Sequence, residues 1–176
     1  MAPPPDSLKD APPTEPLTAL QTHLKFFDTD DDGIIFPIDT YLGMRSIGFG
    51  RIFSTLAMLF IHFGFSYPTI PGWLPDPFLR IHIIRGHRAV HGSDTRAFSH
   101  EGELDNERFE KIFNFGEKDS LTIGEVFALI HGDMNPFDLF GTVAGIFEWG
   151  TTYLLLWPED GRLKKEDIRG IMDVRV

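Results

Sequence analysis

A twelve-residue stretch from Asp28 to Asp39 has residue types and spacing typical of a calcium-binding EF-hand loop. Aspartates occupy loop positions 1, 3, 5 and 12, and position 7 supplies its main-chain carbonyl oxygen. Gly33 at position 6 permits the left-handed backbone that turns the chain around an ion. Without a cation, the clustered carboxylates would repel one another. The predicted calcium ligands are Asp28, Asp30, Asp32, Ile34 and Asp39.

Position 12 departs from the usual pattern, because Asp39 stands where a glutamate normally binds the ion through both oxygens. The aspartate side chain is one methylene shorter, so its bidentate reach is reduced. We therefore expect weaker calcium binding, or stronger competition from magnesium, than at a loop with glutamate.

Helices are expected on both sides of this loop. Thr14 or Glu15 caps the incoming helix, with Pro16 in its first turn, and apolar residues recur along it at helical spacing. These residues are Leu17, Leu20, Leu24 and Phe27. His23 lies on the same stripe, five residues before the first ligand. The outgoing helix is expected to begin at Pro37, where the missing N–H costs nothing.

Two later segments have the outline of the same loop without its ligands. When Leu121 is aligned with Ile35 at position 8, Lys118 falls at ligand position 5, where its charge would repel calcium. The same alignment of Leu163 leaves positions 1 and 3 without carboxylates. The predicted fold is therefore mainly α-helical, with EF-hand-like helix–loop–helix units, one with a full ligand set and two degenerate.

An uncharged apolar segment from Ile52 to Tyr67 leads into a proline-rich stretch that ends at Phe78. Its sixteen residues are fewer than the ~20 that a membrane-spanning helix needs. Because the prolines predict a turn or extended chain, the segment is either a hairpin that dips into lipid or a buried helix with a rigid loop. Periodicity alone does not decide between them. A second apolar stretch, Phe137 to Leu156, is expected to form a buried or lipid-facing helix rather than a membrane span.

The composition restricts the partners of the chain. Its formal net charge of −10 argues against nucleic acid and against electrostatic docking on anionic lipid, so any membrane contact must be hydrophobic. The absence of cysteine excludes disulfides, thiolate zinc sites and thiolate-ligated haem. No apolar signal core follows Met1, so a secretory signal peptide is not expected.

Arginines and histidines gather in the one locally basic stretch of this acidic chain. The residues are Arg80, His82, Arg85, His87, Arg88, His91 and Arg96. Such a run is usually a solvated face or a headgroup contact, but the interleaved histidines also allow it to hold an anionic cofactor.

Several motifs of the chain, in their order and spacing, resemble those of the caleosin family, also called plant seed peroxygenases. The resemblance extends from His23 to Asp173. It rests on the segments His23–Asp28, Gly48–Gly50, Pro71–Pro77, His87–Asp94, Asn135–Gly141 and Phe147–Gly150. The third of these resembles the family's proline knot, which makes the apolar segment an inserted hairpin.

Together with the patterns above, the resemblance divides the chain into five regions of one compact unit. The regions are a disordered proline-rich tail (1–14), an EF-hand (15–50), an apolar lipid-associating segment with the proline knot (51–78), a haem-binding segment rich in histidine and arginine (79–108) and a C-terminal helical lobe with degenerate EF-hands (109–176).

The resemblance further implies a calcium-binding haem peroxygenase, which transfers one oxygen from a fatty-acid hydroperoxide to an unsaturated lipid or other acceptor. Its implied cofactors are haem b (heme b) and Ca²⁺. Its implied location is the lipid droplet and associated endomembranes, on the cytosolic face, with self-association as a further option.

The family's two haem histidines match His23 and His91. We expect one to be the proximal ligand and the other a distal or displaceable group that acts as acid and base. His87, four residues before His91, is the main rival because it would share a helical face with it. The candidates to pair with haem propionates or a lipid carboxylate are Arg85, Arg88 and Arg96.

Two other functions also fit the residues. One is a calcium-dependent coat or tether protein of lipid droplets, without catalysis. The other is a soluble calcium sensor whose apolar segment belongs to the core.

Overall fold

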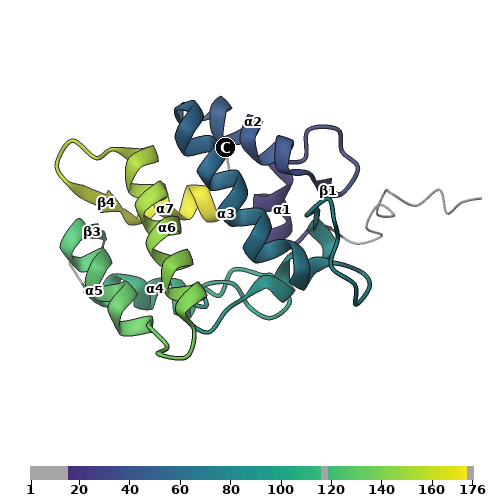
Figure 1. The fold of residues 1–176 in the computed structure, drawn as a ribbon. Helices are drawn as coiled ribbons and strands as arrows, with labels where there is room; N and C mark the ends of the chain where they lie inside the picture. The colour runs from purple at the N-terminus through teal and green to yellow at the C-terminus, as the bar shows by residue number, and fades with distance from the viewer. Residues whose placement is uncertain (1–15, 116–118, 174–176) are drawn as a thin grey trace, which may run out of the picture. The chain divides into compact units, whose positions relative to one another are not determined.

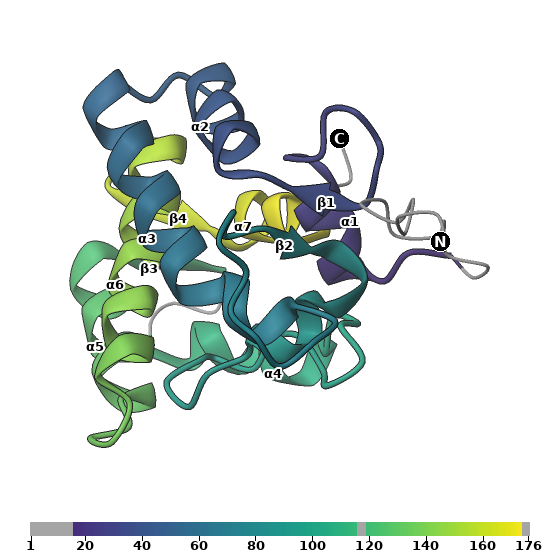
Figure 2. The ribbon, with the colours of Figure 1, turned by 45° about the vertical axis from the view of Figure 1, so that its right-hand side comes forward.

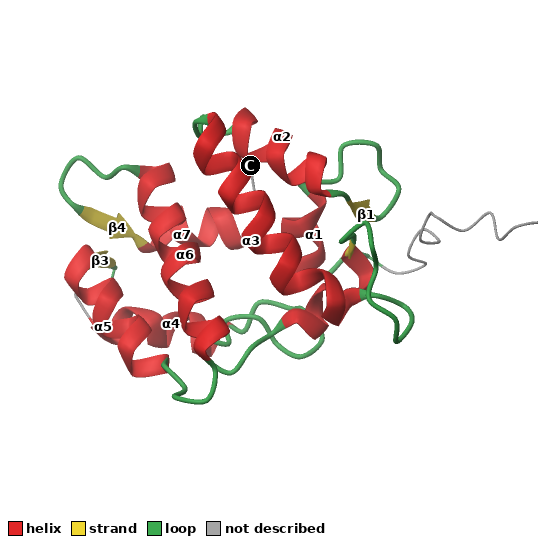
Figure 3. Cartoon of the chain, viewed as in Figure 1, coloured by secondary structure: helices red, strands yellow, loops and turns green. Residues whose placement is uncertain are grey.

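The chain is mainly helical, as predicted, in a computed structural model that describes residues 16–115 and 119–173 (Figure 3). It divides into two compact units, Met1–Ala89 and Val90–Val176, and each is described here by itself. The predicted tail at residues 1–14 and the predicted helix caps Thr14 and Glu15 lie outside the described residues.

The described part of the first unit, residues 16–89, contains three α-helices, two short strands and a 3-10 helix. These are α1 (Ala19–Lys25), β1 (Ile34–Ile35), α2 (Pro37–Ser46), α3 (Arg51–Thr69), β2 (Ile81–His82) and η1 (Ile83–Ala89). α1 begins later than predicted, because Thr18 Oγ1 accepts from Gln21 N while Gln21 Oε1 accepts from Thr18 N, and this capping box starts the helix there. α2 begins at Pro37, as predicted.

The two strands of the first unit join segments that lie far apart in the sequence. β1 and β2 pair antiparallel, with Ile34 opposite His82 and Ile35 opposite Ile81 (Figure 2). Buried isoleucines of the strand pair and of the residue that follows it form a small core, and partly buried apolar side chains pack against this core. The core residues are Ile35, Ile81 and Ile83, and the surrounding residues are Leu24, Phe27, Ile61 and Phe65.

α3 packs along α2 (Figure 1). It buries its small and polar residues rather than its large apolar ones. The buried residues of α3 are Ser54, Ala57, His62, Ser66 and Thr69. Its exposed large residues follow one helical stripe and are Ile52, Leu56, Leu59, Phe63 and Tyr67. The buried polar groups have partners: Ser66 Oγ donates to Arg80 O at 2.8 Å, for example. α3 therefore presents an apolar face to its surroundings.

The prolines after the apolar segment do end this helix, but the first of them, Pro68, does not. α3 continues through Pro68 and ends at Thr69, so it has 19 residues. A proline deprives one carbonyl of the preceding turn of its N–H donor, which costs little near a helix end. In the same turn Thr69 Oγ1 lies 3.1 Å from Phe65 O and 2.9 Å from Ser66 O, which are other carbonyls than the one that Pro68 leaves without a donor.

The second unit repeats the alternation of helix, loop, strand and helix. Its elements are α4 (Asn106–Ile112), η2 (Phe113–Phe115), β3 (Ser120–Thr122), α5 (Ile123–Asp133), α6 (Leu139–Leu156), β4 (Arg162–Lys164) and α7 (Lys165–Asp173). β3 and β4 pair antiparallel, with Leu121 opposite Leu163. α5 and α6 pack against each other (Figure 2).

The second unit has a larger apolar core than the first. Its buried members are Ala97, Phe109, Ile112, Phe113, Leu121, Val126, Leu129, Trp149, Leu163 and Ile168. Leu121 and Leu163 are fully buried within it. The core therefore centres on the two positions that the sequence aligns with Ile35.

In the part of the chain that the structure describes, two helices, α3 and α6, are long and apolar enough to cross a membrane by length and composition alone. The sixteen residues of the predicted apolar segment Ile52–Tyr67 lie within a helix of 19 residues. Most of each helix's most apolar stretch is not buried inside the protein, with 28% of it buried in α3 and 22% in α6.

Candidate functional site

Three predicted calcium ligands come together in the loop between α1 and β1. One carboxylate oxygen from each of Asp28, Asp30 and Asp32 can be chosen so that all lie within 4.8 Å of one another. Oxygens that bind one calcium ion at about 2.3–2.6 Å stand at most about 5 Å apart, so this spacing suits the ion. The left-handed backbone expected at Gly33 is present, with φ +82°, and Asp31 adds a second left-handed residue at φ 63°.

Backbone amides and a lysine hold the first carboxylate in place. Asp28 Oδ1 accepts from Asp32 N at 3.2 Å, and Oδ2 accepts from Gly33 N at 3.0 Å and from Lys25 Nζ at 2.6 Å. Lys25 also pairs with Asp31. Burial opposes ionisation of Asp28, but these hydrogen bonds outweigh it and lower the pKa of its carboxyl. Asp28 is thus held as the anion that a cation requires.

The remaining two predicted ligands have different surroundings. Asp39 Oδ2 accepts from Phe36 N at 2.8 Å and so caps α2, and Asp39 is not among the three clustered carboxylates. Ile34 lies in β1, and its own N–H donates to Asp32 Oδ1 at 2.8 Å. One carboxylate oxygen of Asp39, at position 12, is therefore engaged in capping the helix that follows the loop.

The loop between α3 and β2 contains a cation of its own. Arg80 Nε donates to Asp76 Oδ2 at 2.6 Å, and Arg80 N donates to the same oxygen at 3.1 Å. The guanidinium carbon lies 5.9 Å from the ring centre of Phe36 and 5.6 Å from that of Phe78. Burial opposes ionisation of Asp76, but Arg80 and two backbone amides outweigh it and lower the pKa of its carboxyl.

This loop also matches the calcium loop in its backbone, although the sequence analysis did not identify it as a related loop. Gly33, Leu79 and Gly161 each have positive φ, at +82°, +52° and +72°, and each lies two residues before a paired apolar residue. His62 joins the loop to α2, with Nδ1 2.6 Å from Leu79 O and Nε2 2.8 Å from Thr40 Oγ1. This loop does not match the EF-hand sequence pattern, because it has Leu79 where the pattern has glycine and an Asp76–Arg80 ion pair in place of a set of carboxylates.

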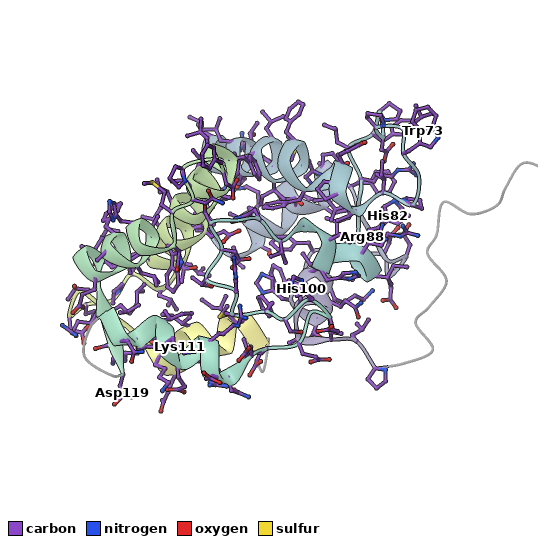
Figure 4. All side chains as sticks on the ribbon, turned by 90° about the horizontal axis from the view of Figure 1, so that it is seen from below. Trp73, His82, Arg88, His100, Lys111 and Asp119 are labelled. Carbon is purple, nitrogen blue, oxygen red and sulfur yellow. The ribbon has the colours of Figure 1, made fainter. Side chains whose placement is uncertain are left out.

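The predicted haem residues are divided between the two units. In the first unit, His23 lies half-buried in α1, and His87 lies half-buried in η1. Arg85 Nη1 donates to Ile70 O at 3.3 Å, and Arg88 is exposed (Figure 4). His91 belongs to the second unit and follows η1 in a loop, so His87 and His91 do not share a helical face.

In the second unit, His91 lies against the start of α6. Its Nδ1 is 3.8 Å from Asp138 Oδ2, and its side chain is only 10% exposed. Phe140 meets the imidazole edge-on, with ring centres 6.3 Å apart. His91 and Ser93 of one motif segment therefore lie beside Asp138 and Phe140 of another, Asn135–Gly141. Asp138 was missed as a site residue, because nothing in the sequence relates it to a histidine so far away.

Exposed apolar side chains surround the loop after α3 as well as the stripe on α3 itself. Trp73 is 79% exposed, Leu74 63% and Phe78 64%. Figure 4 shows Trp73 on the outside of the ribbon. On α6 and the turn before it, large apolar residues are also exposed, among them Phe137, Leu139, Val143 and Ile146. Such faces on two apolar helices are consistent with association with a lipid surface.

Comparisons with known proteins agree with the sequence resemblance. The family model described as caleosin related protein matches residues 15–176. A peroxygenase of Lilium longiflorum is 41% identical over 160 residues, which cover 89% of this chain and 67% of the lily protein. A protein of Arabidopsis thaliana named probable peroxygenase 4 is 35% identical over 162 residues, covering 88% of this chain and 80% of that protein.

A third relative differs in its name. It is a probable inactive peroxygenase-like protein of Arabidopsis thaliana, 27% identical over 138 residues, which cover 74% of this chain and 64% of the relative. No solved structure matches the chain. From the family match over residues 15–176 and the two relatives above 30% identity, the chain belongs to the caleosin family.

Proposed function

We propose that this chain is a calcium-binding haem peroxygenase that works at a lipid surface. It transfers one oxygen from a fatty-acid hydroperoxide to an unsaturated lipid or another acceptor. The observation that carries this proposal is the family match over residues 15–176, together with relatives named peroxygenase at 35% and 41% identity. The cytosolic face of lipid droplets and associated endomembranes is the proposed location.

The helix–loop–strand–helix units support a finer description of the fold. We propose that they are EF-hands in two pairs, with Ile35 opposite Ile81 in one pair and Leu121 opposite Leu163 in the other. Within residues 16–115 and 119–173, only the loop at residues 28–39 combines three clustered carboxylates with the left-handed glycine. Calcium binds there, through Asp28, Asp30 and Asp32 with the main-chain carbonyl of Ile34, and Asp39 joins them if it leaves its capping hydrogen bond.

The donor set of the chain fits haem b. Without cysteine, imidazole is the natural iron ligand, and His23 and His91 are the proposed pair. The crowded side of the His91 ring is the Nδ1 side, where a Cβ added at Gly141 would come within 2.6 Å of that nitrogen. Nε2 is therefore the nitrogen of His91 that we assign to the cofactor. Bound haem supplies the oxygen-transfer chemistry that no amino-acid side chain provides.

The protein's own groups supply proton transfer and charge. The histidine that does not hold the cofactor firmly, when neutral, takes the hydroperoxide proton on a ring nitrogen and returns it to the leaving oxygen. Arg85, Arg88 and Arg96 are the proposed partners of the haem propionates. His87, half-buried in η1, is the alternative ligand, although it does not share a helical face with His91.

The lipid surface is supported by the outward apolar face of α3. A stripe of exposed apolar residues along 19 residues, next to the exposed Trp73, would be costly in water at about 25 cal/mol per Å². The same face supports a second function, a calcium-dependent coat or tether protein of lipid droplets without catalysis, because binding lipid requires no cofactor. The two functions differ in whether the protein holds haem.

Haem binding by the purified protein tests the proposal. Protein expressed with added haem should have a Soret band and oxidise an unsaturated fatty acid when given a hydroperoxide. Both should be lost in His91→Ala and retained in His100→Ala, which removes an exposed histidine from the same unit. A wild-type protein that takes up no haem but floats with oil droplets would support the coat or tether function instead.

Calcium dependence is tested separately, because His23 lies on the helix that leads into the calcium loop. We propose that the ion orients this helix and so sets the position of His23. The double variant Asp28→Ala and Asp32→Ala should then bind haem more weakly in a titration. Unchanged haem affinity and turnover in that variant would refute the coupling.

A further inference from the structure

The carboxylate of Asp138 is fixed in position before any ligand arrives. Asp138 is the N-cap of α6, where its Oδ1 accepts from Gly141 N at 2.7 Å. Its Oδ2 accepts from Ser93 N at 2.9 Å. The loop that carries His91 and the helix that carries Asp138 are thus joined by the same carboxylate.

A second set of contacts ties the two backbones together around this carboxylate. Ser93 Oγ accepts from Asn135 N at 3.2 Å, and Asp138 N donates to Asn135 O at 2.9 Å. Ser93 is buried, at 8% exposure. The carboxylate therefore has little freedom to move away from the imidazole.

Two glycines approach the pair closely. A Cβ added at Gly141 would lie 2.1 Å from Asp138 Oδ2, so this position needs glycine for the carboxylate to sit beside the ring. A Cβ added at Gly92 would lie 3.2 Å from the same oxygen, a tighter contact than usual. With Phe140 edge-on to the imidazole, the ring is held between a side chain and a helix start.

Two backbone amides, those of Gly141 and Ser93, donate to the two oxygens of Asp138, and the carboxylate lies beside the Nδ1 side of the His91 ring. A carboxylate beside a histidine that binds a metal usually accepts the proton of the nitrogen that is not bound.

We propose that Asp138 is the positioning residue of His91: it accepts the Nδ1–H, fixes the tautomer and leaves Nε2 for the iron. The role of Nε2 rests on the proposed function, whereas the tautomer is a property of the protein alone. The separation of 3.8 Å requires only a small movement of the ring to become a hydrogen bond.

Three variants separate positioning from helix capping. Asp138→Asn keeps the size and removes the charge, and Asp138→Ser keeps a good N-cap that is too short to reach the ring. Gly141→Ala keeps the carboxylate but displaces it. The matched control is Asp105→Ser, at the N-cap of α4, whose carboxylate accepts from Arg108 N at 3.1 Å. Circular dichroism and thermal unfolding check that each variant is folded.

Two readouts are measured, and one needs no cofactor. In haem-free protein, ¹⁵N NMR of labelled histidine should show His91 protonated at Nδ1 in the wild type and in Asp105→Ser. The Asp138 variants should shift toward the Nε2–H tautomer. In haem-loaded protein, the Asp138 variants should bind haem about 10- to 100-fold more weakly, as for other partners of metal-binding histidines, and have a higher reduction potential.

The outcomes distinguish the two proposals. If the wild type binds haem through His91, but tautomer and potential are the same in both Asp138 variants and in Asp105→Ser, the positioning role is wrong. If the wild type binds no haem, the proposed function fails, and the tautomer in the haem-free protein alone decides the role of Asp138. A loss of haem in Asp138→Asn that Asp105→Ser matches would mean a general effect on stability and would also overturn the proposal.

Discussion

The two strand pairs of the molecule have the same backbone arrangement and are held together differently. Ile35 faces Ile81 in the first unit, and Leu121 faces Leu163 in the second. The first pair has a core of three buried residues, and the second has a core of ten. The first unit depends more on charged groups, because three clustered aspartates and a buried ion pair flank its strands.

The comparison teaches that apolar pairing and ion binding are separable properties of this loop. In the second pair, Arg162 Nε donates to Ser120 Oγ at 2.8 Å across the strands, and an apolar core provides the stability. In the first pair, Arg80 and Asp76 stabilise one loop without a metal, while its partner loop is suited to calcium. One arginine takes over the neutralising role that an ion has elsewhere.

The largest effect is expected in the core of the second pair. Leu121→Ala should lower the free energy of unfolding by about 3–5 kcal/mol, because the leucine is fully buried and its removal leaves a cavity. Leu154→Ala, at a residue 46% exposed on α6, should change it by less than about 0.5 kcal/mol. Denaturant unfolding measures both. A loss below about 1 kcal/mol for Leu121→Ala would contradict the idea that this pair relies on its apolar core.

The next effect concerns the ion of the first pair. Calcium at about 100 times its dissociation constant should stabilise the wild type by about 2.7 kcal/mol. Asp28→Asn should abolish this stabilisation and weaken calcium binding in calorimetry, because the charged ligand nearest the core is lost. Asp119→Asn, in the loop before β3, is the control and should leave calcium binding unchanged. Equal calcium affinity in both variants would contradict the assignment of the calcium site to the loop at residues 28–39.

A smaller effect is expected when Arg80, which neutralises Asp76 in the loop between α3 and β2, is replaced. Arg80→Met should cost about 2 kcal/mol of unfolding free energy, because it leaves the buried carboxylate of Asp76 without its cation. Arg88→Met, at an exposed arginine of the same unit, should be close to neutral. If the two substitutions cost the same, the ion pair does not hold this loop.

The smallest effect is a pH dependence carried by His62. Burial lowers the pKa of His62 below its ordinary value of 6.5, against the hydrogen bond to Leu79 O. Because the folded state binds this proton less readily, its contribution is complete above pH 6.5 and is lost as the pH falls below that value. His62→Gln should flatten this part of the profile, and His100→Gln should not. Identical slopes in all three proteins would show that the buried His62 is not responsible.

The sequence predicted the family, the helical class and the start of α2, because each rests on local patterns. Loop alignment also identified Leu121 and Leu163, which the structure pairs, since position 8 must be apolar in both. β2 was missed because Leu79 turns the chain without glycine and Arg80 replaces carboxylates that a motif requires. The contact between His91 and Asp138 joins two distant segments, and only the packing of α6 on its loop reveals it.

The exposed Trp73 is a fluorophore on the surface that we propose contacts lipid. Tyr67 Oη donates to the main-chain carbonyl of Trp73 at 3.3 Å, so the backbone at Trp73 is joined to α3, and β2 follows it in sequence. Indole emission depends on the polarity around the ring, which differs between water and hydrocarbon. With Trp149 and Trp157 replaced by phenylalanine, Trp73 is the remaining tryptophan, and the wavelength of its emission maximum reports contact with lipid. A shift of this maximum on adding calcium would report coupling between the calcium loop and the lipid-facing surface.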